Sequence, residues 1–336
     1  MERVLIANQP EVTQLLPMAE CIDVMVDTLK ALAAGQALLP LRTMMVLPGG
    51  DNLMGLMPSY LANIQSLGVK VIAAFPSNFG SEYDTHQGVV ILFDAKYGLL
   101  RAILDGTSIT AIRTAAVSGV ATRLLAREDA GDLALIGAGT QAHTHLEAMK
   151  CVRKLRRVRV YSLPLDGAHA FAERESKRHA ILVEVKETAR QAVEGADIIC
   201  TTSTAREPVL NGEWVAPGTH INAVGAFTPT TRELDSQTVA QARLYVDRRE
   251  STLHEAGEFL IPKAEGLFGD EHIVGELGEV LVGNVTGRRS PTEITLFKSL
   301  GIAIEDLAAA HHVLQKARQS GFGLWVEIGG QHFGSA

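Results

Sequence analysis

The sequence predicts an α/β protein in which a doubly wound parallel sheet is joined to an α+β domain with a largely antiparallel sheet. Two features of the chain predict this fold class. From Asp132 onward, short apolar strands alternate with helices, which is typical of a parallel sheet with crossover helices. In the first third, strand-like runs follow one another too closely for crossover helices, so neighbouring strands should be antiparallel.

Hydrophobic periodicity and turn residues place the individual elements. The first domain should contain a helix over 11–34, strands over 41–47, 52–60, 68–75, 88–93 and 99–104, and a helix over about 109–126 with Thr107 or Ser108 as N-cap. The parallel strands should cover 133–136, 158–162, 181–185, 197–201, 220–224 and 244–246. A last helix over 297–320 should end at Gly321, and residues 324–328 should add a strand to the N-terminal sheet. We therefore expect one domain of residues 1–119 with 307–336 and another of residues 120–306.

The stretch 133–149 has the pattern of a dinucleotide-binding turn. An apolar strand is followed by Gly137, Gly139 and Ala142 at the spacing G-x-G-x-x-A, and then by an amphipathic helix. Gly137 permits the tight turn, Gly139 lets the backbone approach a pyrophosphate, and Ala142 lets the helix pack closely on the strand. An ordinary turn explains two glycines equally well, but here strand, turn and helix agree. The pattern therefore indicates a Rossmann-type domain that binds NADP or NAD.

Composition excludes several other classes of protein. The net charge of −7 argues against a nucleic-acid or anionic-membrane binder, and no stretch approaches the length of a transmembrane helix. The three cysteines are odd in number and lack metal-site spacing, so we expect reduced thiols and a cytoplasmic protein. His143 and His145 do not share a helix face, so no metal site is expected.

Three cations of the first domain are candidates for binding an anionic substrate. Arg113 should lie within about the first turn of its helix, where a cation is unfavourable unless an anion compensates it. Arg42 and Lys70 each interrupt an apolar strand, and Thr85 lies in the loop before another. Singly, each cation is explained by a solvated strand face or a salt bridge. Together with a cofactor site they favour a clamp for a carboxylate, because a guanidinium gives two parallel hydrogen bonds.

The chain resembles the ornithine cyclodeaminase/mu-crystallin family over nearly its whole length. The matching motifs, in order, are 56–58 (LMP), 85–88 (THQG), 110–116 (TAIRTAA), the glycine turn, 221–225 (INAVG), 275–279 (GELGE) and 297–301 (FKSLG). The resemblance implies that the first domain, completed by the C-terminal helix, binds substrate and forms a homodimer through its sheet. It also implies that Arg42, Lys70 and Arg113 surround the substrate carboxylate. With the glycine turn, the residues expected to line the cofactor are Thr85, Thr140, Gln141, Ser162, Thr202, Asn222, Ala223, Val224, Gly225 and Ser299.

Two departures from the family pattern bear on the reaction. The cyclodeaminases have an acidic residue where this chain has Phe227, and a glutamate where it has Gly55. A phenyl ring exchanges no proton and offers no anionic partner to the second amine of ornithine. We therefore predict an NAD(P)H-dependent reductase of small cyclic imino acids, such as Δ1-pyrroline-2-carboxylate. Its catalytic residues are Lys70 and Arg113, and Phe227 contacts the substrate. The alternatives are ornithine cyclodeaminase itself and a mu-crystallin-like binding protein without catalysis.

The choice of nicotinamide cofactor depends on the end of the second parallel strand. NAD-preferring sites place an acidic residue there, which holds the ribose 2′-OH and repels a 2′-phosphate. This chain has Ser162 at that position, although Asp166 follows closely. Arg159 or Arg174 are the candidates to reach a phosphate. We expect NADPH to be accepted and preferred by about tenfold or less.

Overall fold

The computed structural model describes residues 3–50, 52–78 and 80–329, and the chain divides into two compact units. The first unit comprises Met1–Arg113 and Ile302–Ala336, and the second comprises Thr114–Gly301. Helix α3 (Gly106–Leu125) begins in the first unit and ends in the second. The expected domain limits fall a few residues later in the sequence, inside α3 and inside the last helix.

The first unit is built on one sheet with the strand order β16-β1-β7-β6-β5-β4-β2, with β3 paired to β4. Its strands are β1 (Val4–Ala7), β2 (Ala37–Leu38), β3 (Thr43–Val46), β4 (Leu53–Leu61), β5 (Ser66–Ala74), β6 (His86–Asp94), β7 (Leu100–Asp105) and β16 (Leu324–Val326). All described pairings are antiparallel except that of β1 with β7. The predicted antiparallel sheet is therefore confirmed, as is its final strand near residue 324.

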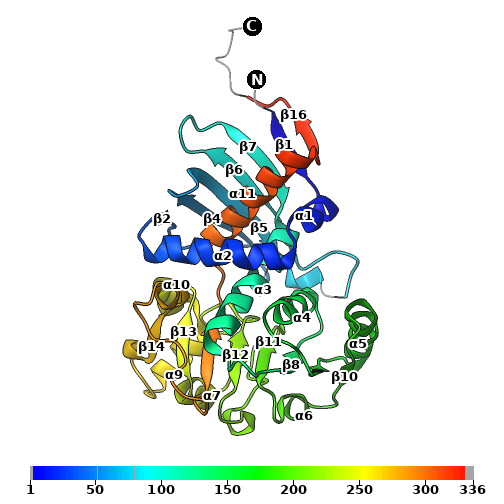
Figure 1. The fold of residues 1–336 in the computed structure, drawn as a ribbon, viewed down its shortest axis with the longest axis vertical. Helices are drawn as coiled ribbons and strands as arrows, with labels where there is room; N and C mark the ends of the chain where they lie inside the picture. Colours follow the sequence, from blue (N-terminus) through cyan, green and yellow to red (C-terminus); the bar gives the residue numbers. More distant parts are fainter. Residues whose placement is uncertain (1–2, 51, 79, 330–336) are drawn as a thin grey trace. The chain divides into compact units, whose positions relative to one another are not determined.

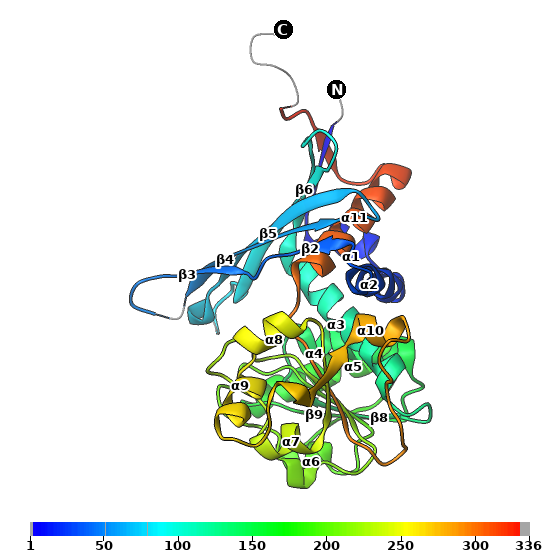
Figure 2. The same cartoon turned by 90° about the vertical axis from the view of Figure 1, so that its left-hand side faces the viewer.

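Helices α2 (Met18–Ala33) and α11 (Ala303–Ser320) cover one face of this sheet (Figures 1 and 2). Side chains alternate between the two faces, so the buried Met57, Lys70 and Val90 stand side by side on the covered face. Gly68 allows α11 to approach closely, because a Cβ there would lie 2.9 Å from Leu307. On the other face β4 presents Met54 and Leu56, and no helix of the described first unit covers them.

Three predicted helix limits are wrong, each for a local reason. The helix expected over 11–34 is two helices, α1 (Gln9–Leu15) and α2, because Pro17 disfavours a helical conformation at the residue before it. Helix α3 starts at Gly106, and Asp105 caps it by accepting a hydrogen bond from the Ser108 amide at 2.7 Å. Thr107 and Ser108 thus lie inside the helix. The last helix starts at Ala303 rather than 297, because Thr295–Lys298 form strand β15.

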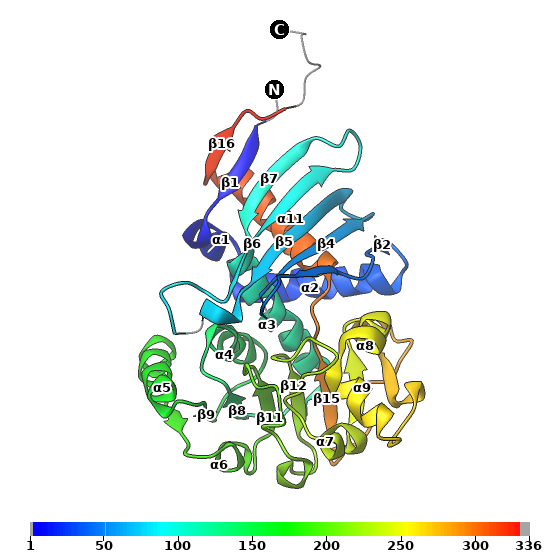
Figure 3. The ribbon, with the colours of Figure 1, turned by 180° about the vertical axis from the view of Figure 1, so that it is seen from behind.

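The second unit is a parallel sheet with the order β10-β9-β8-β11-β12-β15-β13-β14 (Figure 3). Its strands are β8 (Asp132–Ile136), β9 (Arg157–Tyr161), β10 (Val183–Val185), β11 (Ile198–Thr201), β12 (His220–Ala223), β13 (Arg243–Val246), β14 (Ile273–Glu276) and β15. The helices are α4 (Thr140–Val152), α5 (Leu165–His179), α6 (Ala189–Val193), α7 (Ser236–Gln241), α8 (Arg249–Glu255), α9 (Gly257–Ala264) and α10 (Leu277–Leu281). The order reverses at β8, as in a doubly wound sheet, and the predicted fold class is confirmed. None of the helices in the described chain is long and apolar enough to span a lipid bilayer.

A dinucleotide-binding turn and a buried cation cluster

The predicted glycine turn connects β8 to α4. Gly137 has φ +115°, and a Cβ there would lie 2.7 Å from the Thr202 carbonyl oxygen, so no other residue fits. Gly139 is the N-cap of α4, and no described atom lies within 4 Å of the place where its Cβ would be. Ala142 is fully buried, as close packing of α4 on the sheet requires. The backbone at Gly139 is therefore open to a large anion at the start of a helix, which fits a pyrophosphate.

The other predicted cofactor residues of the second unit lie at the carboxyl ends of its strands. Thr140 and Gln141 form the first turn of α4, Ser162 follows β9, and Thr202 follows β11. The last residue of β12 is Ala223, and Val224 and Gly225 come directly after it. Ser299 directly follows β15. Ligands of doubly wound sheets bind at this edge. Contact of these residues with a dinucleotide stays a prediction.

Asn222 has a side chain that is turned into the core. Its Nδ2 donates to Thr122 Oγ1 at 3.1 Å, and its Oδ1 lies 3.2 Å from His220 Nε2. The residue is 0% exposed. The Asn222 side chain is therefore engaged within the core, and contact of this residue with a cofactor stays a prediction.

The two arginines considered for a ribose phosphate are engaged elsewhere. Arg159 is buried and donates to the carbonyl oxygens of Gln191 and Glu194. Arg174 donates to Glu175 at 2.6 Å. A role for Arg159 in phosphate binding is therefore wrong. The absence of an acid at Ser162 still predicts acceptance of NADPH.

Glu233, which the sequence did not single out, holds together the loops that follow β11 and β12. This fully buried carboxylate accepts hydrogen bonds from Thr201 Oγ1 (2.8 Å), from the amide and hydroxyl of Ser203 (2.6 and 2.7 Å) and from the Gly225 amide (2.7 Å). Burial raises its pKa, with Glu258 adding to the effect and the Ser203 bonds opposing it. A Cβ on Gly225 would lie 2.1 Å from the Ser203 carbonyl oxygen, so the two loops are in close contact. Glu233 is therefore a positioning residue for two predicted cofactor-binding segments.

In the first unit, the predicted cations form a buried cluster with two acids of α11. Lys70 Nζ lies 2.8 Å from Asp306 Oδ2, and Arg113 donates from Nε to Asp306 (2.9 Å) and from Nη1 to Glu305 (2.7 Å). The Lys70, Arg113, Glu305 and Asp306 side chains are at most 4% exposed. Arg42, just before β3, is close enough to help lower the pKa of Lys70. Three cations thus gather around two carboxylates, an arrangement that suits an anionic ligand.

Arg113 has anionic partners, but it does not lie at the start of its helix as expected. Because α3 starts at Gly106, Arg113 lies beyond the first turn, where the helix dipole has little effect. The compensating anions are Glu305 and Asp306, which are far away in the sequence. Direct contact of Arg113 with a substrate stays a prediction.

Lys70 has the electrostatics of a group that can exchange a proton near neutral pH. Burial lowers the pKa of this ammonium to about 8, with Asp306 raising it and Arg113 and Arg42 lowering it. The Lys70 Nζ also donates to Thr110 Oγ1 at 3.4 Å. The predicted catalytic lysine is therefore a better proton donor than an exposed lysine.

The remaining candidates lie in apolar or loop surroundings. Phe227 packs against the hydrophobic core of the second unit. A Cβ on Gly55 would meet Met44 and Ile72, so this position has no room for a glutamate without rearrangement. Thr85 is half-buried in the loop before β6, with its hydroxyl 3.2 Å from His86 Nδ1.

The fold and the turn define an α/β protein of the dinucleotide-binding class. The profile of the ornithine cyclodeaminase/mu-crystallin family matches residues 2–321. The Delta(1)-pyrroline-2-carboxylate reductase of Bacillus cereus is 37% identical over 325 residues, which are 96% of this chain and 100% of the relative. The ketimine reductase mu-crystallin of Mus musculus is 41% identical over 82% of this chain and 84% of its own. The chain therefore belongs to the ornithine cyclodeaminase/mu-crystallin family, as predicted.

A solved structure extends this similarity to three dimensions. The Thermococcus litoralis Delta(1)-pyrroline-2-carboxylate reductase, in complex with NADH and L-proline, matches with a TM-score of 0.94 and 40% identity. The match covers 96% of this chain and 99% of that one.

Replacing Glu233 tests its positioning role. Glu233→Gln puts an amide NH2 where only donors approach, so at least one buried donor loses its acceptor at a cost of about 1–3 kcal/mol. We expect weaker NADH binding in a fluorescence titration and a melting temperature lower by several degrees. Glu207→Gln, at an exposed position of the same unit, should change neither. Unaltered NADH affinity in Glu233→Gln would show that the loops hold their geometry without this carboxylate.

Proposed function

We propose that this protein is an NAD(P)H-dependent reductase of small cyclic imino acids, with Δ1-pyrroline-2-carboxylate as the favoured substrate. The observation that carries the proposal is the buried cluster that holds Lys70 and Arg113 together, with the half-buried Arg42 close enough to help lower the pKa of Lys70. A planar carboxylate suits the forked donors of the arginines. The second unit supplies a turn that fits a dinucleotide. The similarity to two reductases of cyclic imines supports the same reaction.

The residues of the chain account for the chemistry that the cofactor does not supply. The reduced dinucleotide, when bound, provides the hydride for the C=N carbon. Arg42 and Arg113 hold the carboxylate and so fix the orientation of the ring. Lys70, with its pKa lowered to about 8, is the proton source for the imine nitrogen when that nitrogen is not already protonated.

The surroundings of two residues favour a reductase over a cyclodeaminase. Cyclisation of ornithine brings a second amine into the site, which needs an anionic partner or a base. Phe227 lies on an apolar cluster, and the neighbours of Gly55 are Met44 and Ile72. These positions therefore suit an apolar ring better than an ammonium group.

An absorbance assay separates this function from its alternatives. The purified protein should oxidise NADH or NADPH when Δ1-pyrroline-2-carboxylate is added, and proline should form in equal amount. Release of ammonia from ornithine without net change of cofactor would instead identify a cyclodeaminase. A protein that binds nucleotide but shows neither reaction would be a binding protein.

The clamp is tested through Arg42, which is half-buried. Arg42→Ala should raise the KM for the imino acid by roughly tenfold or more, because about 1.4 kcal/mol of charge-assisted binding corresponds to one factor of ten. The melting temperature should change little. Arg318→Ala, which removes an exposed arginine from α11, is the matched control and should leave KM as it is. An unchanged KM in Arg42→Ala would remove Arg42 from the clamp.

We also propose that the protein is a homodimer that joins through the uncovered face of the first unit's sheet. On this face strands β2 to β5 expose the apolar side chains of Leu38, Met45, Met54, Leu56 and Leu67, each at least 38% exposed. Leu56 pairs with Val71 of β5, and directly paired residues lie on the same face of the sheet. This face is therefore apolar across neighbouring strands. An antiparallel sheet with a solvated face normally alternates apolar with polar residues. A second copy of this face supplies the apolar surface that would cover it.

A charge on this face should break the dimer. The Leu56→Lys variant should have half the mass of the native protein in analytical ultracentrifugation. Each subunit of its dimer would bury one lysine charge against the apolar face of the other subunit. Leu182→Lys, at an exposed leucine of the second unit, should remain dimeric. A monomeric native protein, or a dimer that survives Leu56→Lys, would contradict this interface.

The thiols support a cytoplasmic location for such an enzyme. Cys21, Cys151 and Cys200 are all unpaired, and burial raises the pKa of Cys21 and Cys200, which disfavours their oxidation.

A further inference from the structure

Three side chains outside the predicted reductase site converge between α4 and α5. They are His143 from the first turns of α4, and Glu175 and His179 from the second half of α5. The ligand atoms of all three lie within 4.8 Å of one another. His143 Nδ1 is 2.8 Å from Glu175 Oε2, and His179 Nε2 is 3.4 Å from the same oxygen. One carboxylate oxygen thus stands between two imidazole nitrogens.

Burial distinguishes this cluster from an ordinary surface group. Glu175 is 0% exposed, and the side chains of His179 and His143 are 9% and 22% exposed. Among the described residues, His179 Nε2 is a buried nitrogen without a hydrogen-bond partner. Buried polar atoms normally have a hydrogen-bond partner or another ligand. A buried imidazole nitrogen that faces a carboxylate without a hydrogen bond to it therefore suggests that a further group binds between them.

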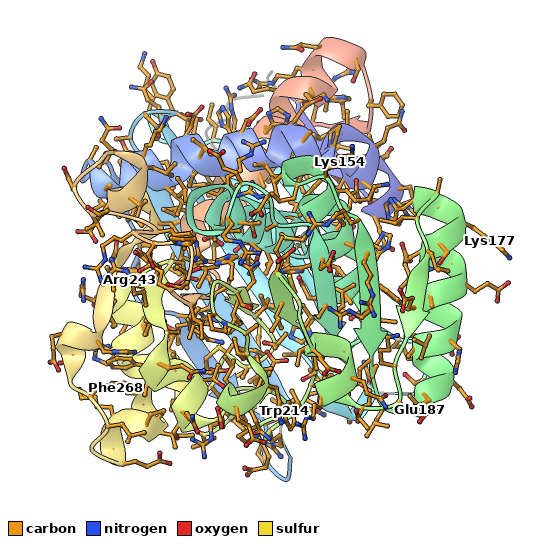
Figure 4. All side chains as sticks on the ribbon, turned by 60° about the horizontal axis from the view of Figure 1, so that its bottom comes forward. Lys154, Lys177, Glu187, Trp214, Arg243 and Phe268 are labelled. Carbon is orange, nitrogen blue, oxygen red and sulfur yellow. The ribbon has the colours of Figure 1, made fainter. Side chains whose placement is uncertain are left out.

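The helix positions make the arrangement specific. Glu175 and His179 are four residues apart, so they share one face of α5, and that face is turned toward α4. The opposite face carries Lys177, which points to solvent in Figure 4 and pairs with the exposed Glu173. No metal site is expected from α4 alone, because His143 and His145 do not share a face of that helix. The second of these histidines, His145, is buried, and its Nε2 lies 2.9 Å from Ser118 Oγ.

We propose that His143, Glu175 and His179 form a binding site for a divalent transition metal, with Zn²⁺ as the best-suited ion. Two imidazoles and a carboxylate are the ligand set of open zinc sites, with bonds of about 2.0–2.2 Å and a fourth position for water. Ligand atoms around such an ion lie about 3–3.5 Å apart, so small rotations of the side chains complete the site. Burial lowers the pKa of His179, which favours the neutral imidazole that binds metals.

The neighbours of the cluster are compatible with this role. Arg174 donates to Glu175 Oε1 at 2.6 Å, which orients the carboxylate and leaves Oε2 directed at the histidines. Lys150 donates to the His179 carbonyl oxygen at 2.9 Å and so ties the end of α5 to α4. An ion here would join the two helices beside the glycine turn.

The test is a titration of the full chain with Zn²⁺ alone, followed by calorimetry and thermal unfolding. All proteins carry Cys151→Ser, because the exposed Cys151 thiol could itself bind zinc. The parent should bind one Zn²⁺ per chain and melt at a higher temperature with the ion. His143→Ala, at the most exposed ligand, should weaken binding by at least about a hundredfold, since loss of even a supporting partner costs roughly 10–100-fold. His169→Ala, an exposed histidine of α5, should bind as the parent does.

Cobalt provides a second readout that does not depend on stability. Co²⁺ bound to the parent and to His169→Ala should give the visible absorption of a low-symmetry site, and His143→Ala and His179→Ala should not. Equal Zn²⁺ binding in the parent and in His143→Ala, or no binding by the parent, would overturn the proposal. The cluster would then be a hydrogen-bonded network of α4 and α5 only.

Discussion

The first unit depends on the buried ion pairs that join its last helix to its sheet and to α3. Lys70 comes from β5, Arg113 from α3, and Glu305 and Asp306 from the start of α11. Removing one partner of such a cluster typically costs about 3–5 kcal/mol, because it leaves an unpaired charge in the interior. The residues after Ile302 therefore belong to the same unit as the N-terminal sheet. The nearness of Arg42 to Lys70 and Arg113 also makes this cluster suited to an anion.

The second unit fixes its functional edge by a similar use of buried carboxylates. Glu233 accepts four hydrogen bonds from the loops after β11 and β12. Asp247 accepts hydrogen bonds from the Leu300 and Gly301 amides at 2.7 Å and so holds the turn that contains Ser299. A carboxylate suits this task because it accepts bonds from several directions and needs no proton. Loops held in this way keep their shape before any cofactor binds, which reduces the entropic cost of binding.

Local patterns predicted most of the fold, whereas contacts distant in the sequence could not be predicted. Alternating and continuous apolar runs located six strands of the first sheet and six of the parallel strands, and the glycine spacing located the turn at Gly137. Strands β1, β2, β14 and β15 were missed. Each has only two to four residues, and part of β15 was assigned to the helix that follows it. The partners of Arg113 come from the other end of the chain, and no local pattern pairs them. Glu233 lies in the charged segment 232–235, which resembles a surface loop in sequence although the residue is buried.

The central claim is that the Lys70 ammonium, buried beside Asp306, takes part in turnover in its charged form. Its lowered pKa of about 8 means that the charged form is lost as pH rises through that value. The measurement is the pH dependence of kcat/KM for imino-acid reduction, in the native protein and in Asp306→Asn. Native kcat/KM should fall by about tenfold per pH unit above about 8. Because Asp306 raises the pKa of Lys70, the fall should begin at lower pH in the variant. A profile that stays flat through this range, or one that Asp306→Asn leaves in place, would contradict a role for Lys70.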